Sequence, residues 1–262
     1  RNFRITTFGE SHGKALGVVI DGCPPGIPLA AADIQPFLDR RRPGKSPLES
    51  PRKEPDRVEI LSGLFQGRTT GAPLTLVVGN RDIREEDYLE LEEIFRPGHA
   101  DFTYQAKYGI RDHRGGGRSS GRETVARVAA GAVAAKFLAG KGIQITSRIL
   151  EIHGKRDPDG MAKEIEKARD EGDSVGGIAE VLVTGSPAGL GDPVFGKLDA
   201  LLAGALMGIG AVKGVEIGEG FASARMKGTS VVDDLMIHDI DIALHALFHC
   251  RPSSLVSAGN DD

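Results

Sequence analysis

A group of cationic and hydroxyl side chains surrounds a glycine run in the middle of the chain. Three consecutive glycines, at 115–117, lead into Arg118, Ser119 and Ser120. A glycine loop at the start of a helix offers backbone N–H groups to an anion, and arginine adds bidentate donors suited to phosphate or carboxylate. These residues predict an anion-binding site. A flexible turn flanked by solvated arginines is the alternative interpretation.

Two histidines lie in glycine-containing segments elsewhere in the chain. His12 belongs to residues 10–13 (ESHG), and His99 belongs to residues 96–101 (RPGHAD), close to Arg96. An imidazole titrates near neutral pH and can therefore donate or accept a proton. Beside an anion site, the pair predicts proton donation around a phosphorylated or carboxylated substrate. Taken alone, a histidine that bonds a turn carbonyl is the simpler interpretation of either residue.

The elements expected to position these residues are short strands and amphipathic helices. Ser120 followed by Glu123 has the pattern of a capping box, so we expect a helix to begin there. Another helix is expected to begin at Asp192, with Pro193 in its first position. Strands are expected at 3–7, 16–21, 58–62, 74–78, 143–152, 178–184 and 212–217, and further helices at 31–42 and 159–171. The absence of a regular strand–helix alternation favours an α+β fold over a Rossmann sheet.

One internal similarity suggests a duplicated architecture. Residues 19–27 (VIDGCPPGI) resemble residues 183–190 (VTGSPAGL), and each segment leads toward a helix that contains Leu-Asp, at 38–39 and 198–199. We interpret this as two related strand–turn–helix halves. Chance recurrence of a common Gly- and Pro-containing turn is the alternative.

Composition excludes several classes of protein. The 262 residues carry a formal net charge of −4, which argues against a general binder of nucleic acid or anionic membranes. The two cysteines, Cys23 and Cys250, form neither a disulfide framework nor a zinc motif, so we expect no metal site and reduced thiols in a cytoplasmic protein. No apolar run approaches the ~20 residues of a membrane-spanning helix.

Six segments together resemble the chorismate synthase family. They are residues 9–13 (GESHG), 39–44 (DRRRPG), 95–101 (FRPGHAD), 114–123 (RGGGRSSGRE), 187–191 (PAGLG) and 211–218 (AVKGVEIG). The resemblance covers roughly residues 3–229, and several motifs in the family's order are far more specific than one. It implies a single domain over 1–262, an α+β fold of the β-α-β sandwich type with helices between two mainly antiparallel sheets, and a homotetramer.

The resemblance also implies an activity and its residues. The reaction converts 5-enolpyruvylshikimate 3-phosphate to chorismate and phosphate by trans-1,4-elimination, in the shikimate pathway. It needs reduced FMN without net redox change, and NADPH is a candidate for reducing the flavin. The resemblance implies that His12 and His99 donate protons to the departing phosphate and to the flavin, in either order. It implies Arg118, Ser119, Ser120 and Arg41 as cofactor-binding residues. The implied substrate-binding residues are Arg41, Arg96 and Arg122.

The chain departs from the family in two places. Pro47 stands where many members have an arginine, and residues 231–262 lack the family's Arg-His-Asp-Pro motif and flavin loop. We therefore expect the C-terminal segment to be atypical or truncated. Two alternatives follow: a C-terminally incomplete, catalytically weak flavin- or phosphate-binding protein, and an unrelated arginine-rich anion-binding domain.

Overall fold

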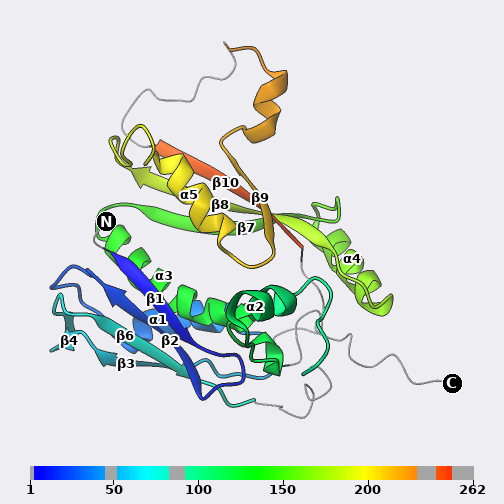
Figure 1. Ribbon diagram of the computed structural model, residues 1–262. Coiled ribbons are helices and arrows are strands. Elements are labelled where there is room, and N and C mark those ends of the chain that lie inside the picture. The colour runs from blue at the N-terminus through cyan, green and yellow to red at the C-terminus, as the bar shows by residue number, and fades with distance from the viewer. Residues whose placement is uncertain (1–2, 45–51, 83–91, 229–239, 250–262) are drawn as a thin grey trace. The chain divides into compact units, whose positions relative to one another are not determined.

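The structure is a computed structural model that describes residues 3–44, 52–82, 92–228 and the backbone of 240–249. The chain falls into two compact units. Unit 1 comprises residues 1–47 and 51–137, and unit 2 consists mainly of residues 138–262. Each unit contains one four-stranded antiparallel sheet (Figure 1).

The sheet of unit 1 has the strand order β1-β2-β6-β3, and a small β4–β5 hairpin accompanies it. Helix α1 follows β2, and the helical segments α2, η2, η3 and α3 follow β6 in the sequence. The bounds are β1 Arg4–Gly9, β2 Ala15–Asp21, α1 Ala31–Arg41, β3 Val58–Ser62, β4 Leu64–Phe65, β5 Arg68–Thr69, β6 Leu74–Gly79, α2 Asp101–Tyr108, η2 Arg114–Ser119, η3 Gly121–Glu123 and α3 Thr124–Ala139.

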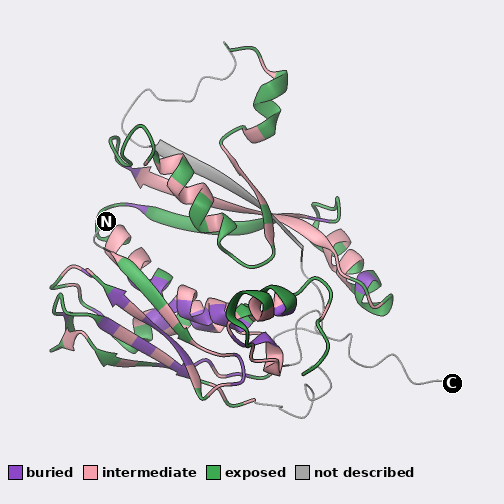
Figure 2. Cartoon of the chain, viewed as in Figure 1, coloured by how far each residue is buried: buried purple, intermediate pink, exposed green. Residues whose placement is uncertain are grey.

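The core of unit 1 forms where α1 and α3 pack against one face of this sheet. Every second residue of β6 is buried, as expected for a strand with one covered face. Along β2 the large apolar residues at 16, 18 and 20 are buried in the same way, and Gly17 is buried as well. Helix α3 contributes many alanines, whose small side chains allow a close approach to the sheet. Figure 2 shows the buried positions concentrated on these strands and on α3. The cluster includes Leu16, Val18 and Ile20 of β2, Leu74, Leu76 and Val78 of β6, Ile34 and Leu38 of α1, and Val125, Ala129 and Val133 of α3.

The sheet of unit 2 repeats the same topology. Its order is β7-β8-β10-β9, so in each unit the first strand pairs with the second, and the fourth strand lies between the second and the third. In each unit a helix connects the second and third strands. The bounds are β7 Gln144–Ile152, α4 Pro158–Asp170, β8 Gly176–Ser186, α5 Leu198–Met207, β9 Val212–Ile217, η4 Gly220–Arg225 and β10 Ile240–His249.

The similarity between the two turn segments extends to their backbone. Gly22 and Gly185 both have φ of 71°, and Gly26 and Gly189 have φ of 85° and 89°. These left-handed conformations favour glycine. The α+β class with antiparallel sheets and two related halves is confirmed. The Leu-Asp pairs are not equivalent, because residues 38–39 lie near the end of α1 and residues 198–199 begin α5.

The helix expected from Asp192 was placed too early. Asp192 and Gly196 exchange two backbone hydrogen bonds, each with an N···O distance of 2.8 Å. The Gly196 carbonyl turns back to the Asp192 N–H, whereas in a helix it would accept from the N–H of residue 200. Helix α5 therefore begins at Leu198, after Lys197 as its N-cap.

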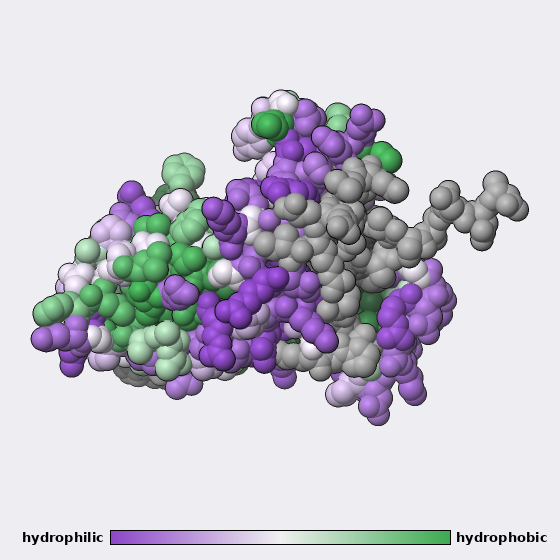
Figure 3. Space-filling view, turned by 90° about the horizontal axis from the view of Figure 1, so that it is seen from below, coloured by the Kyte–Doolittle hydropathy of each residue, from purple (hydrophilic) through white to green (hydrophobic). Residues whose placement is uncertain are grey.

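The surface mixes apolar and hydrophilic areas. On the face shown in Figure 3, apolar residues gather over one area, and hydrophilic residues cover much of the remainder. Large exposed apolar side chains of unit 1 include Leu61 and Phe65. Among the described residues, none of the helices has the length and apolar character required to cross a membrane.

Candidate functional site

The glycine run adopts a backbone that requires glycine. Gly115, Gly116 and Gly117 have φ of 59°, 81° and 52°, and they interrupt the 3-10 segment η2. Three successive positive φ values are accessible to glycine but strained for residues with a Cβ. The loop is therefore a fixed, left-handed structure that leads through η3 into α3.

Ser120 begins this helical segment as predicted, but the capping box is incomplete. The Ser120 hydroxyl accepts a hydrogen bond from the Arg122 backbone N–H at 3.3 Å. The Glu123 carboxylate accepts instead from the Thr7 hydroxyl at 2.8 Å and from Arg127 Nε at 2.9 Å. Glu123 therefore links the helix start to β1 and to the next helical turn, contacts that the local pattern does not encode.

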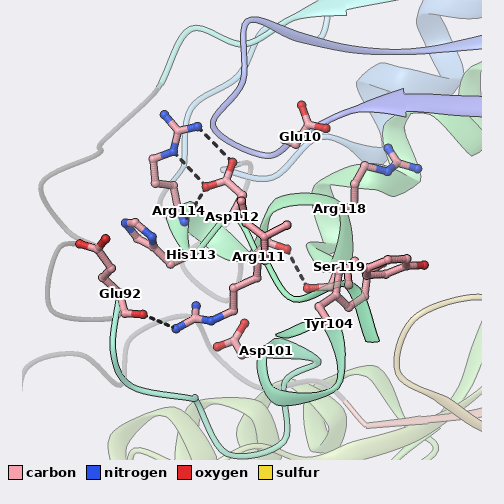
Figure 4. A pocket seen from close by; sticks show the side chains of 13 residues that line it. Glu10, Glu92, Asp101, Tyr104, Arg111, Asp112, His113, Arg114, Arg118 and Ser119 are labelled. Atoms are coloured by element: carbon pink, nitrogen blue, oxygen red, sulfur yellow. Dashed lines mark hydrogen bonds and ion pairs between the residues drawn. The ribbon is translucent and has the colours of Figure 1, made fainter. Parts of the chain in front are cut away.

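A cavity of about 970 Å³ lies beside the glycine loop (Figure 4). Such a volume is within the usual range for small-molecule and cofactor sites. Its walls combine aromatic, cationic and acidic side chains from unit 1. Among the residues implied by the family resemblance, Arg118 and Ser119 line it. The other side chains include Tyr104, Tyr108, Arg111, Asp112, His113 and Arg114, together with Glu10, Glu92, Asp101 and Ile110.

Two carboxylates in the cavity wall are neutralised by neighbouring arginines. Asp101 accepts from Arg96 Nε at 2.9 Å and Nη2 at 3.0 Å, and Asp112 accepts from Arg114 at 3.0 and 3.1 Å. Burial raises the pKa of each carboxyl, but hydrogen bonds from the paired arginine outweigh it and lower both pKa values. Both groups are therefore held as carboxylates at neutral pH.

Arg111 adds positive charge to the same cavity. Its Nη2 donates to the backbone carbonyls of Glu92 and Ile94, at 2.8 and 3.1 Å, and Figure 4 shows it turned toward Glu92. Its guanidinium also lies over the Phe95 ring, 5.1 Å from the centroid. Carbonyls and an aromatic face orient the guanidinium, and its charge helps to lower the pKa of the neighbouring Asp101 carboxyl.

Arg118 is anchored to the first strand. Its Nη1 donates to the Gly9 carbonyl at 2.8 Å, and its Nη2 donates to the Thr7 hydroxyl at 2.6 Å. Ser119 donates to the Gly116 carbonyl at 2.7 Å. These contacts fix both side chains at the cavity wall before any ligand binds.

The turn that carries His12 packs directly on the glycine loop. A Cβ added to Gly115 would lie 2.3 Å from His12 Nδ1 and 2.9 Å from the Ser11 hydroxyl oxygen. The Ser11 N–H donates to the Gly117 carbonyl at 3.3 Å. His12 is only 6 % exposed, so its ring is held against the loop in a protected position.

The turn that carries His99 contacts the same loop through Arg96. A Cβ on Gly116 would lie 3.0 Å from Arg96 Nη2. His99 itself is exposed, with its Nδ1 3.3 Å from the Pro97 carbonyl oxygen. Neither His12 nor His99 lines the cavity as defined above. The structure thus brings both histidine-bearing turns to the glycine loop, with one ring buried against it and the other at an exposed turn.

Arg41 and Arg122 occupy a buried ionic cluster rather than the cavity wall. Both contact the carboxylate of Asp56, which is fully buried, with Arg41 Nη1 at 3.3 Å. Arg41 also donates to the Thr124 hydroxyl at 3.3 Å and the Gly121 carbonyl at 3.2 Å. Burial lowers the pKa of Arg41, although the charge of Asp56 opposes this. Both arginines therefore tie the start of α3 to the rest of unit 1.

Several residues of this region were not singled out from the sequence. Arg52, Glu54 and Asp56 lie in the proline-containing segment between α1 and β3, and Asn80 follows β6. Glu54 is 3 % exposed and accepts from Arg52 Nη2 at 2.9 Å. A buried carboxylate usually needs such a partner, but no local pattern identified which acids of the loop would be buried.

The comparisons with known proteins agree with these motifs. The model of the family described as chorismate synthase matches residues 3–246. The chain belongs to the chorismate synthase family. The chorismate synthase of Syntrophobacter fumaroxidans is 62 % identical over 255 residues, covering 90 % of this chain and 72 % of the relative. The Methanosarcina mazei chorismate synthase is 54 % identical with the same coverage.

A solved structure gives the same result for the fold. The crystal structure of a chorismate synthase has a TM-score of 0.79 and 30 % sequence identity, covering 97 % of this chain and 84 % of the other. The segment 231–262, expected to be atypical for the chorismate synthase family, lies outside the described residues except for the backbone of β10. Pro47 also lies outside them. Within the described ranges, no group of three or more His, Cys, Asp or Glu side chains could hold a metal ion.

Proposed function

We propose that this chain is a carbon–oxygen lyase of the shikimate pathway, which converts 5-enolpyruvylshikimate 3-phosphate to chorismate and phosphate. Membership of the chorismate synthase family supports the reaction. The structural observation that carries the proposal is the packing of His12 against a rigid glycine loop at the edge of an arginine-containing cavity. A leaving phosphate needs charge neutralisation and a proton, and these groups supply both.

The cavity residues suit reduced FMN. Tyr104 and Tyr108 offer aromatic surface for a flat ring system, and Arg111 and Arg118 offer positive charge for a phosphate. Ser119 and the left-handed glycine backbone allow a close approach to the loop. When bound, the reduced flavin supplies the electron chemistry of the elimination. We propose Arg118, Ser119 and Ser120 as its main contacts, and NADPH as the source of its electrons.

The protein's own groups would then act on the substrate. His12, shielded from water and fixed by the loop, donates a proton at its imidazole nitrogen, and His99 is the second donor. Arg96, held at the loop by its ion pair with Asp101, is the proposed hydrogen-bond donor to the departing phosphate. Arg41 and Arg122, predicted as direct ligands, are held by Asp56, which supports a role in shaping the site from behind. A cytoplasmic homotetramer is the assembly that the family resemblance favours.

An anaerobic assay with dithionite-reduced FMN tests this function. The protein is expected to form chorismate and release phosphate in equal amounts from 5-enolpyruvylshikimate 3-phosphate. The His12→Gln variant should retain flavin affinity while kcat falls by about 100-fold or more, as for loss of a general acid. Flavin binding without turnover by the unmodified protein would favour the catalytically weak binding protein. Absence of flavin affinity, with unchanged function after both His12→Ala and His99→Ala, would favour an unrelated anion-binding domain.

A further inference from the structure

The backbone of the turn that carries His12 is held by side chains from two distant segments. Asn80 Nδ2 donates to the Glu10 carbonyl at 3.0 Å and to the Gly13 carbonyl at 2.8 Å. Arg52 Nη2 donates to the Ser11 carbonyl at 2.9 Å. Three carbonyls of a four-residue turn thus accept hydrogen bonds from Asn80 or Arg52.

Arg52 also bonds the side chain next to the histidine. Its Nη1 donates to the Ser11 hydroxyl oxygen at 3.0 Å. Ser11 is 1 % exposed, so this bond forms away from bulk water. Because the planar Arg52 guanidinium bonds both the hydroxyl and the carbonyl of Ser11, it restrains the side-chain rotamer and the peptide plane of Ser11.

Two buried charged residues fix these donors in turn. Glu54 accepts from Arg52 Nε at 3.2 Å and Nη2 at 2.9 Å, and it also accepts from the backbone N–H of Arg81 at 3.0 Å. Arg122 Nε donates to Asn80 Oδ1 at 3.1 Å. This second bond fixes the orientation of the Asn80 amide, so that its NH₂ group faces the turn.

We infer that Arg52 and Asn80, oriented by Glu54 and Arg122, are positioning residues that hold His12 against the glycine loop. The inference rests on the proposed role of His12 as a proton donor. The loop contacts the ring from one side at Gly115, and the two side chains restrain the turn through its carbonyls. A displacement of about 1 Å in a catalytic group can reduce a rate by about 100-fold, so these residues affect catalysis without touching the substrate.

The Asn80→Asp substitution tests this most cleanly. It keeps the size of the side chain and the oxygen that Arg122 bonds, but it replaces both donors to the turn by an acceptor. Arg52→Lys is the second variant, because it keeps the charge beside Glu54 and loses the planar fork. Gln35→Glu is the matched control. Like Asn80, Gln35 donates through its amide to a backbone carbonyl, that of Asp56 at 3.0 Å. It also donates to Asp39 Oδ1 at 3.1 Å, and its side-chain oxygen accepts from Val58 N–H at 3.2 Å.

We expect Asn80→Asp and Arg52→Lys to lower kcat by about 10- to 100-fold with KM changed less than about twofold. Gln35→Glu should leave kcat unchanged. In a double-mutant cycle, Asn80→Asp should cause no further loss in the His12→Gln background, because the group it positions is absent. NMR signals of the His12 ring, recorded without flavin, should shift in Asn80→Asp and not in Gln35→Glu.

The possible outcomes separate the two proposals. Unchanged kcat in folded Asn80→Asp and Arg52→Lys proteins overturns the inference, and so does an equal further loss in the His12→Gln background. Failure of both variants to fold, when Gln35→Glu folds, assigns Arg52 and Asn80 a purely structural role and also overturns it. Full activity of His12→Gln overturns the proposed function of His12 instead, and the NMR shifts then decide on positioning alone.

Discussion

Substitution of Gly115 by alanine should disturb His12 more than it disturbs the fold. The new Cβ would lie 2.3 Å from Nδ1 and 2.4 Å from Cε1 of His12, closer than real Cβ contacts, so the ring must move by about 1 Å. The left-handed backbone, with φ of 59°, adds about 1–2 kcal/mol of strain for an L-residue, and overpacking adds about 1–3 kcal/mol. We expect a total loss of about 2–5 kcal/mol in the free energy of unfolding and a fall of about 100-fold in kcat.

Gly67→Ala provides the control for backbone strain. Gly67 has φ of 71°, and a Cβ added there meets nothing within 4 Å. Its cost should be only the ~1–2 kcal/mol of strain, with unchanged kcat. Urea unfolding and the anaerobic chorismate assay measure the two quantities for both variants. If Gly115→Ala keeps the kcat of the unmodified protein, or if both glycines cost the same in stability and activity, the close packing of His12 on this loop is refuted.

Three further predictions concern buried polar groups. Asp101→Asn weakens the pair with Arg96 and should cost about 1–3 kcal/mol in the free energy of unfolding near pH 7. Because the folded pKa of Asp101 is lowered, the carboxylate stabilises the protein above the unfolded pKa of about 3.9, and this contribution is lost as the pH falls through the folded pKa. Urea unfolding at about pH 3 should therefore show a smaller difference between the variant and the unmodified protein. Asp56→Asn removes the nearer of the two carboxylates paired with buried Arg122 and leaves only Glu54, 3.7 Å away. It should cost about 3–5 kcal/mol in urea unfolding, and a cost below about 1 kcal/mol would contradict the pairing. Burial raises the pKa of the Cys23 thiol, so alkylation at neutral pH, followed by mass spectrometry of its peptide, should be slow until urea unfolds the protein; rapid labelling of folded protein would oppose this burial.

Local signals were sufficient for many of the elements. Strands β3 and β9 occupy the predicted residues 58–62 and 212–217, because short apolar or alternating runs between turn residues are a local signature. The similarity of the two turns could also be predicted from the sequence, because backbone positions with positive φ favour glycine and the glycines recur at the same spacing. The expected helix start at Asp192 failed because the Gly196 carbonyl turns back to the Asp192 N–H and closes a tight bridge instead of continuing a helix. Such a bridge depends on how the whole loop closes.

The site was less accessible to prediction, for a physical reason. Residue types and spacing indicated an anion-binding loop, but they could not show which arginines face a ligand. The buried partner of Arg122 lies 66 residues away in the sequence, and the partner of Arg41 lies 15 residues away. Each guanidinium is directed by a carboxylate that comes close only in the folded protein. Glu54 had no sequence signal at all, because burial of an acid depends on its tertiary partners.

A crystal structure of the protein with FMN and 5-enolpyruvylshikimate 3-phosphate tests the central claim most directly. We predict flavin density in the cavity beside Arg118 and Ser119, with the flavin phosphate close to the glycine loop at 115–117. The substrate should lie with a reacting group within hydrogen-bonding distance of His12. Flavin bound away from this cavity, or a His12 ring with no path to the substrate, would contradict the proposed site.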